Sequence, residues 1–205
     1  MEIVHYPHPA LRFPACPVRR VDENIRQLVH EMTRLLLEHH GLGLAAPQVG
    51  YPYQIFLMRP DRAQEDPGHI QVIVNPVLSE FRGSAEEDEG CLSFPGLYQK
   101  IRRAKTVHLR AFDLEGREIA RTLSGLEARV AQHETDHLHG ILFIDRMTEA
   151  ARLASRDALD DLTRRYRDAQ RRGKIPRDEV IIERLKELVS QQGAVTASLA
   201  TPQAV

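Results

Sequence analysis

Five consecutive residues, His133-Glu134-Thr135-Asp136-His137, carry the strongest chemical signal in the sequence. Two histidines four positions apart on a helix point the same way and can bind one metal ion. Glu134 directly follows the first histidine, close enough to exchange a proton with water on that metal. The pattern therefore predicts a metal-dependent hydrolase. The alternative is a solvated helix with chance histidines, which is disfavoured because this helix has its own start, apolar face and stop.

Two histidines do not complete a catalytic site, because such a metal usually takes three protein ligands and leaves one position for water. Some metalloproteases supply a third histidine in the pattern HExxHxxGxxH. That pattern is absent here, since LHGILFIDRM follows His137. His139 lies on another side of the helix. Two candidates for the third ligand remain open. Glu149 is the nearest downstream glutamate, as in zinc endopeptidases, and Cys91 lies in the segment Glu89-Gly90-Cys91-Leu92-Ser93.

A third segment, GLGLAAPQVG at 41–50, is rich in glycine but lacks the spacing or the lysine of a phosphate-binding loop. Its small residues allow the backbone to approach another group closely. Gln48 is its one side chain that can donate a directed hydrogen bond.

Together the three segments resemble the peptide deformylases. GLGLAAPQ, EGCLS and QHETDH match the three motifs of that family in order and with suitable spacing. The segments IVHYPHPALR, VNPVL and GILFIDRM are also similar, so the resemblance, which is to the bacterial type, covers about residues 1–150. His8 stands where the family often has Asp.

The resemblance implies that Cys91, His133 and His137 bind one divalent metal. Fe²⁺ is the ion expected in the cell, with Zn²⁺, Ni²⁺ or Co²⁺ able to occupy the site. It further implies a hydrolase that removes the N-formyl group from the initiator formyl-methionine of new proteins and releases formate. Hydroxide on the metal would attack the formyl carbon, with Glu134 as general base and then acid.

The resemblance also implies which residues stabilise the charge that develops on the formyl oxygen and which residues contact the substrate. The Gln48 side-chain amide and the Leu92 backbone N–H are expected to stabilise the oxyanion. Substrate contacts are expected from Gly43, Leu44, Glu89, Gly90, Leu126 and Val130. Two other functions compete with this hypothesis: a zinc endopeptidase with an acidic third ligand, and a non-catalytic, ribosome-associated relative in which the metal is structural.

Two helices are predicted around these residues. Asp22 as N-cap, an apolar stripe and Gly41 as the C′ residue predict a helix over about 22–40. Ser124 and Glu127 fit a capping box that opens a helix ending before Gly140. That helix carries Leu126, Val130, His133 and His137 on one face, which must enter the core.

The middle of the chain has the pattern of strands. Residues 53–58 and 70–74 are short β-rich runs separated by a polar loop, 59–69. Residues 106–112 and 117–123 alternate about DLEG and predict a hairpin. Four prolines in residues 1–20 predict an extended start. The predicted fold class is α+β, with antiparallel sheets packed around the histidine-bearing helix and a helical C-terminal extension.

Composition divides the chain near residue 150. The 205 residues carry a net charge of −1, but residues 151–205 carry +3 and residues 1–150 carry −4. We expect a catalytic domain over 1–150 and an extension over 151–205 with helices at about 148–172 and 178–191 and a disordered end. A cluster of basic residues there is either a solvated helix face or a docking surface for ribosomal RNA; it comprises Arg164, Arg165, Arg167, Arg171, Arg172 and Lys174.

The sequence also limits where the protein acts. No run of 18 apolar residues exists, which argues against a membrane span. The first residues lack the basic and apolar regions of a secretory signal, so we expect a cytoplasmic protein. Cys16 and Cys91 are far apart and form neither a CxxC pair nor a disulfide framework. The expected partners are N-formyl-methionyl peptides and nascent chains, together with the ribosome through the basic cluster, and no membrane.

Overall fold

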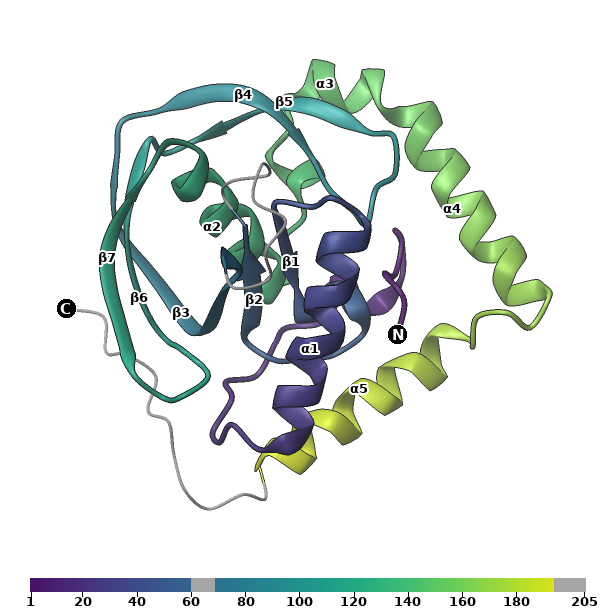
Figure 1. Ribbon diagram of the computed structural model, residues 1–205. Helices are drawn as coiled ribbons and strands as arrows, with labels where there is room; N and C mark the ends of the chain where they lie inside the picture. The colour runs from purple at the N-terminus through teal and green to yellow at the C-terminus, as the bar shows by residue number, and fades with distance from the viewer. Residues whose placement is uncertain (60–68, 194–205) are drawn as a thin grey trace.

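The computed structural model describes residues 1–59 and 69–193, which form two antiparallel sheets and five α-helices (Figure 1). The larger sheet has the order β1-β2-β3-β6-β7 and the smaller one pairs β4 with β5. The strands are β1 (Gly43–Ala45), β2 (Ile55–Met58), β3 (Gln71–Arg82), β4 (Ala85–Gly90), β5 (Tyr98–Arg103), β6 (Thr106–Phe112) and β7 (Glu118–Ser124). The helices are α1 (Glu23–Glu38), α2 (Gly125–Leu138), α3 (Glu149–Ala154), α4 (Arg156–Arg171) and α5 (Asp178–Gly193). The predicted α+β class is confirmed.

Strand β2 shows how the larger sheet separates two helices. All four of its residues are buried, although successive side chains point to opposite faces of a strand, so both faces of β2 are covered. Ile55 and Leu57 pack in the cluster that contains the apolar stripe of α1. Phe56 and Met58 pack instead with the inward residues of α2. The sheet therefore lies between α1 and α2, and it curves around α2 in Figure 1.

Helix α1 follows its sequence signals closely at the start. The Asp22 carboxylate accepts a hydrogen bond from the Ile25 N–H at 3.0 Å, as an N-cap should. Its end differs from the prediction: the helix stops at Glu38, and His40, with φ of 50°, takes the left-handed position expected for Gly41. Histidine tolerates this conformation better than most residues.

Helix α2 begins and ends where the sequence predicted, but the predicted capping box is absent. The Ser124 side chain makes no capping hydrogen bond. Glu127 pairs with Arg121 of β7 at 3.4 Å instead of turning back to the helix start. At the other end, Gly140 has a φ of +70°, and a Cβ there would lie 2.6 Å from the Arg12 carbonyl oxygen. Glycine is therefore required at this stop.

The strand predictions were correct in type and incomplete in extent. The hairpin formed by β6 and β7 is confirmed. The run at 70–74 is the first part of a longer strand, β3. Most of the predicted loop, residues 60–68, lies outside the described residues. Strands β4 and β5 were not predicted, since AEEDEG and YQKIRR are highly charged. The first twenty residues are largely extended, with one 3₁₀ turn, η1 (Pro9–Leu11).

The C-terminal helices leave the two sheets and return toward α1 (Figure 1). The single helix predicted at 148–172 is two helices, α3 and α4, that meet at the buried Ser155. Its hydroxyl donates to the Ala151 carbonyl at 2.8 Å and accepts from Gln99 of β5 at 3.1 Å. Such hydroxyl bonds to the preceding turn compete with the helix ladder and bend helices. The second predicted helix is α5.

The extension packs on the rest of the chain through few side chains. Leu162 of α4 is buried in a cluster with Phe94 and Phe143. Ile181 and Leu185 of α5 pack against Ala10 of η1. The predicted disordered end falls mostly on residues 194–205, which lie outside the described residues. No helix within the described residues has the length and hydropathy needed to cross a membrane.

Candidate metal centre

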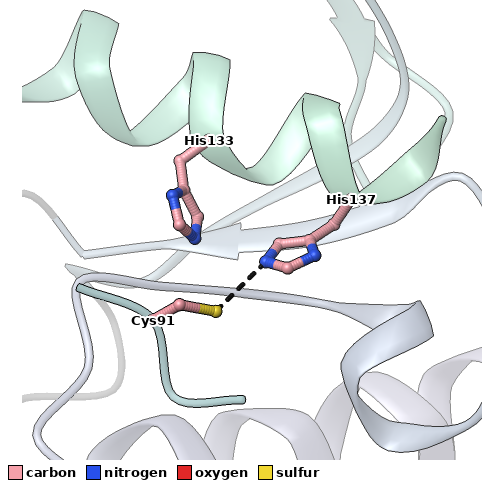
Figure 2. A group of neighbouring side chains, drawn as sticks. All are labelled: Cys91, His133 and His137. Carbon is pink, nitrogen blue, oxygen red and sulfur yellow. Dashed lines mark hydrogen bonds between the residues drawn. The ribbon is translucent and has the colours of Figure 1, made fainter. Parts of the chain in front are cut away.

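Three side chains from two separate segments converge beside α2. His133 and His137 project from the helix toward Cys91, which directly follows strand β4 (Figure 2). Their nearest ligand atoms all lie within 4.8 Å of one another. The Cys91 Sγ lies 3.3 Å from the His137 Nε2. Ligands held tetrahedrally at 2.0–2.3 Å from one ion are about 3.5 Å apart, so the spacing fits a shared metal.

The donor chemistry also suits a metal. One thiol sulfur and two imidazole nitrogens form a set that binds Zn²⁺, Fe²⁺, Co²⁺ or Ni²⁺. Both histidines are buried and Cys91 is half-buried. A group of three protein ligands leaves a position open, as catalytic sites do. Among the described residues, Glu149, the other candidate for third ligand, does not belong to this group.

Glu134 lies beside these ligands as a buried carboxyl group. Its residue is 3% exposed, and its Oε2 has no hydrogen-bond partner among the described residues. Burial raises the pKa of Glu134 to about 7. A Cβ added at Gly43 would lie 2.3 Å from the Glu134 Oε1, so the β1 backbone reaches the carboxyl group only because residue 43 is glycine.

Gln48 completes the wall opposite α2. It lies in η2 (Ala46–Val49) and is 1% exposed. Its Oε1 accepts from the Ala45 N–H at 2.8 Å, which fixes the orientation of the amide. Its Nε2 donates toward the Cys91 Sγ at 3.4 Å and the Ser93 hydroxyl at 3.3 Å. The amide N–H group is therefore directed at the metal-binding side chains.

Comparison with known proteins agrees with this geometry. A family model described as polypeptide deformylase matches residues 1–153. A peptide deformylase from Rhodopirellula baltica is 41% identical over 91% of this chain and 92% of its own. One from Alkalilimnicola ehrlichii is 41% identical over 82% of this chain and 93% of its own.

The chain belongs to the peptide deformylase family. Members of this family are metal-dependent hydrolases that remove the N-formyl group from nascent peptides. Solved structures agree. A deformylase from Plasmodium falciparum has a TM-score of 0.79 at 34% identity, covering 82% of this chain and 98% of its own. Peptide deformylase 1B from Arabidopsis thaliana, in complex with an inhibitor, has a TM-score of 0.77 at 39% identity, covering 86% and 96%.

A cavity of about 610 Å³ leads to the deformylase centre. Most of the residues expected to contact substrate line it, as do the expected catalytic residues. Leu126, 44% exposed, lies at its rim. Leu44 does not line the cavity: its side chain is fully buried and packs in the cluster that contains α1. The lining residues from the predicted set are Gly43, Gln48, Glu89, Gly90, Cys91, Leu92, Leu126, Val130, His133 and Glu134.

Glu89 has a role that sequence reasoning missed. Its Oε1 lies 2.6 Å from the His133 Nδ1, which leaves the other ring nitrogen for the metal. The same carboxylate accepts hydrogen bonds from Arg103 at 2.6 and 3.1 Å and from Arg129 at 3.0 Å. Burial alone would raise the pKa of Glu89, but the hydrogen bonds from His133 and Arg103 lower it well below its ordinary value.

The set of buried charges extends beyond Glu89 to the far side of α2. Arg103, whose side chain is 2% exposed, also pairs with Asp136. Asp136 in turn accepts from Arg146 at 2.5 Å. We name this chain of contacts from His133 through Glu89, Arg103 and Asp136 to Arg146 the buried charge chain. The pairing of the two strands could not have revealed it, because Glu89 lies opposite Gln99 and Arg103 lies opposite Ala85.

Proposed function

We propose that this chain hydrolyses the formyl group of N-formyl-methionyl termini with a divalent metal held by Cys91, His133 and His137 and with Glu134 as the proton carrier. The observation that carries the proposal is the buried Glu134 carboxyl group beside the three candidate ligands. One oxygen of this carboxyl group finds no hydrogen-bond partner in the described part of the chain. The family membership supports the reaction. Cytoplasm is the expected location, because nascent chains are the substrate.

A divalent ion bound there would lower the pKa of water and polarise the formyl carbonyl, which a weakly electrophilic formamide requires. The protein supplies a pre-oriented ligand set. The Glu89 contact holds the His133 ring in one tautomer, with Nδ1 hydrogen-bonded. Cys91, which directly follows β4, would supply the third ligand from outside α2.

Glu134 is suited to carry a proton in both directions. A carboxyl group with a pKa near neutrality takes a proton and returns it with little cost at the working pH. In this role it removes the proton of the attacking water and later delivers it to the amine nitrogen that leaves. The neighbouring Gly43 backbone limits the positions that the carboxyl group can adopt.

Two N–H donors are proposed to stabilise the oxygen on which negative charge develops. The Gln48 Nε2 already points to the ligands, and its carbonyl oxygen is held by the Ala45 N–H. The backbone N–H of Leu92, next to Cys91, is the second proposed donor. Donors that are oriented before the reaction stabilise such charge by about 2.7–4 kcal/mol each.

The methionine side chain is proposed to lie in the cavity beside α2. Gly43 and Gly90 keep the walls open, and Val130 and Leu126 supply apolar contact. Leu44 supports the wall from behind, and Glu89 acts through His133 and the two arginines. The polar part of this wall is Arg129, which is also bonded to Glu87 at 3.1 Å.

Formate release from a formyl-Met-Ala-Ser peptide tests the proposal. The chain is assayed anaerobically after loading with Fe²⁺ or Ni²⁺, beside Glu134→Gln and the control Glu127→Gln on the same helix. We expect a loss of about 10²- to 10⁴-fold in Glu134→Gln at unchanged metal content, and normal rates in the control. Equal rates in the two variants would refute the role of Glu134. No turnover by the metal-loaded wild type would favour the non-catalytic alternative.

Cys91→Ala separates the two ligand sets. We expect tight metal binding to be lost if Cys91 is the third ligand, and kept if an acid such as Glu149 serves as in zinc endopeptidases.

Metal content of protein purified anaerobically identifies the ion. We propose Fe²⁺ in the cell, with Zn²⁺, Ni²⁺ and Co²⁺ as substitutes. Air should then inactivate the enzyme, because both the thiolate and Fe²⁺ oxidise.

We propose that residues 1–150 are the catalytic unit and that 151–205 form an extension that docks on ribosomal RNA. Within the basic cluster, Arg164 and Arg165 pair with Asp161, and Arg171 pairs with Asp168. The cluster members without an ion pair in the described structure are Arg167, Arg172 and Lys174, which are exposed. These three are therefore the phosphate contacts that we propose.

Cosedimentation with ribosomes tests this partner. The triple variant Arg167→Gln/Arg172→Gln/Lys174→Gln should bind more weakly and with a shallower dependence on salt. The control Arg82→Gln/Lys105→Gln/Arg117→Gln removes the same charge from the sheets. Equal binding by the two triple variants would refute docking through α4.

A further inference from the structure

Helix α2 presents a second cavity on the side away from the metal ligands. Gln132, Thr135, Asp136 and His139 follow at i, i+3, i+4 and i+7, which places them on one face. They line a cavity of about 640 Å³ together with parts of β3 and β5. None of its lining residues belongs to the cavity at the metal centre.

One wall of this cavity is apolar and is formed mainly by β3. Val77, Leu78 and Phe81 of β3 line it, and Ile141 adds a further apolar lining residue. Phe81 is 57% exposed, which leaves much of an apolar ring in contact with water. The β3–β6 register shifts between Ser79 and Arg82, and Glu80 has a φ of 49°. Such bulges redirect the side chains that follow, and here the backbone holds Phe81 at the cavity.

The polar wall carries an excess of positive charge. Three arginines, Arg102, Arg103 and Arg146, line the described cavity against one acid, Asp136. Asp136 already forms ion pairs with Arg103 and Arg146, and all three residues belong to the buried charge chain. Arg102 is exposed and has no ion pair within residues 1–59 and 69–193. It is therefore the guanidinium available to an incoming anion.

We propose that this cavity is a second ligand site, which takes small carboxylates that carry an apolar body. The apolar part packs on Phe81 and the β3 wall, and the carboxylate pairs with Arg102. The volume lies in the range of small-molecule sites, about 300–1,000 Å³. A cationic ligand is disfavoured by Arg102, since Arg103 and Arg146 are already paired with acids. A purely polar anion would leave the apolar wall without contact.

Titration of the Zn²⁺-loaded full chain with 4-phenylbutyrate, followed by ¹⁵N NMR, tests this site. The neutral 4-phenyl-1-butanol is the matched control ligand. The variants Arg102→Gln and Phe81→Ser remove the two proposed contacts at exposed positions. The control variants are Arg82→Gln, an exposed arginine that does not line the cavity, and Leu153→Ser, an exposed apolar residue on α3. Unchanged formate release shows that all four variants are folded.

We expect saturable shifts at residues of β3 and β5, a Kd at least tenfold higher in Arg102→Gln and in Phe81→Ser, and no change in the two controls. Three results would overturn the proposal. Shifts confined to residues 41–48 and 89–98 would show that the carboxylate binds only at the metal. Equal affinity for the alcohol would remove the role of the charge, and absence of shifts would remove the site.

Discussion

The wall of the metal centre and the C-terminal extension are held to the protein in opposite ways. At the metal centre, buried charged groups from β4, β5 and α2 bind one another, and the Arg103 and Glu89 side chains are only 2% and 6% exposed. On α4, the ion pairs join residues of the same helix, and Arg164 and Arg165 are 67% and 74% exposed. The extension is attached mainly through apolar anchors such as Leu162.

This difference has energetic consequences. A buried charged group that loses one partner keeps the full cost of its burial. An exposed pair loses little, because water and salt replace the partner. Single substitutions should therefore damage the metal centre strongly, whereas in the extension only the apolar anchors should matter.

Glu89→Gln, at the metal centre, should have the largest effect on stability. Arg103 and Arg129 would face a neutral amide, so we expect the free energy of unfolding to fall by about 3–5 kcal/mol. Metal affinity should also fall by about 10- to 100-fold, because His133 loses its oriented partner. Chemical denaturation and metal titration measure the two effects. Glu86→Gln, exposed on the same strand, is the control, and equal losses in both variants would contradict the expectation.

Leu162→Ala tests the apolar anchor of the extension. Removal of this buried side chain should lower the free energy of unfolding by about 2–3 kcal/mol. The deformylase rate at 25 °C should stay within about twofold, because Leu162 is neither one of the three candidate ligands nor a lining residue of the cavity. Leu153→Ala, at a position 70% exposed, should change neither quantity. A loss of activity without a loss of stability would show that the extension also shapes the site.

Gly43→Ala tests how closely β1 approaches the Glu134 carboxyl group. The new methyl group would overlap the Glu134 Oε1, so the carboxyl group must move. We expect kcat to fall by about tenfold, which corresponds to roughly 1.4 kcal/mol, with a much smaller change in metal affinity. Steady-state assays and metal titration separate the two. An unchanged kcat would mean that Glu134 moves freely.

His8 gives a pH test at the contact between the N-terminal segment and α4. Its ring accepts from the Ala10 N–H at 3.2 Å and contacts Tyr166 of α4, and burial lowers its pKa to about 4. The unfolded chain binds the proton at about 6.5. Stability should therefore fall as pH drops from about 6.5 toward 4, because the unfolded chain then binds a proton that the folded chain does not. His8→Asn keeps an acceptor without this titration, and thermal unfolding at several pH values should show a flatter profile. Identical profiles would contradict the assignment.

Arg165→Gln should produce the smallest effect. Its pair with Asp161 at 2.6 Å is exposed, so we expect a change of less than about 0.5 kcal/mol in the free energy of unfolding. Denaturation at low and high salt measures it. A loss of 2 kcal/mol or more would mean that the ion pairs of α4 hold the extension as firmly as the apolar anchors do.

Much of this fold could be predicted from residue periodicity. The stripe of α1, the alternation of β6 and β7 and the stop at Gly140 are local signals, and each element formed where the signal lies. Strands β4 and β5 could not be found in this way. Their residues are mostly charged, and charged residues face each other across the two strands, as Asp88 does Lys100, so the alternation of apolar and polar residues that marks other strands is missing.

The candidate site divides in the same way. The convergence of Cys91 with the two histidines followed from residue types and the family resemblance. The role of Glu89 did not, because it depends on Arg103 and Arg129, which are distant in sequence and were not recognised as buried. The Leu44 side chain packs in the core and not in the cavity, so its predicted contact with substrate stays a prediction that only its backbone could fulfil.

The two-part origin of the ligands has a consequence for the life of the protein in a cell. Cys91 comes from the β4–β5 side of the centre and the histidines come from α2, so an ion held by all three would cross-link two parts of the chain. Binding that occurs only in the folded state adds stability that grows with the free concentration of the ion. Metal supply should thus set the amount of intact protein as well as its rate of turnover. Starvation for the ion should therefore cause faster proteolysis of this chain in addition to lower activity.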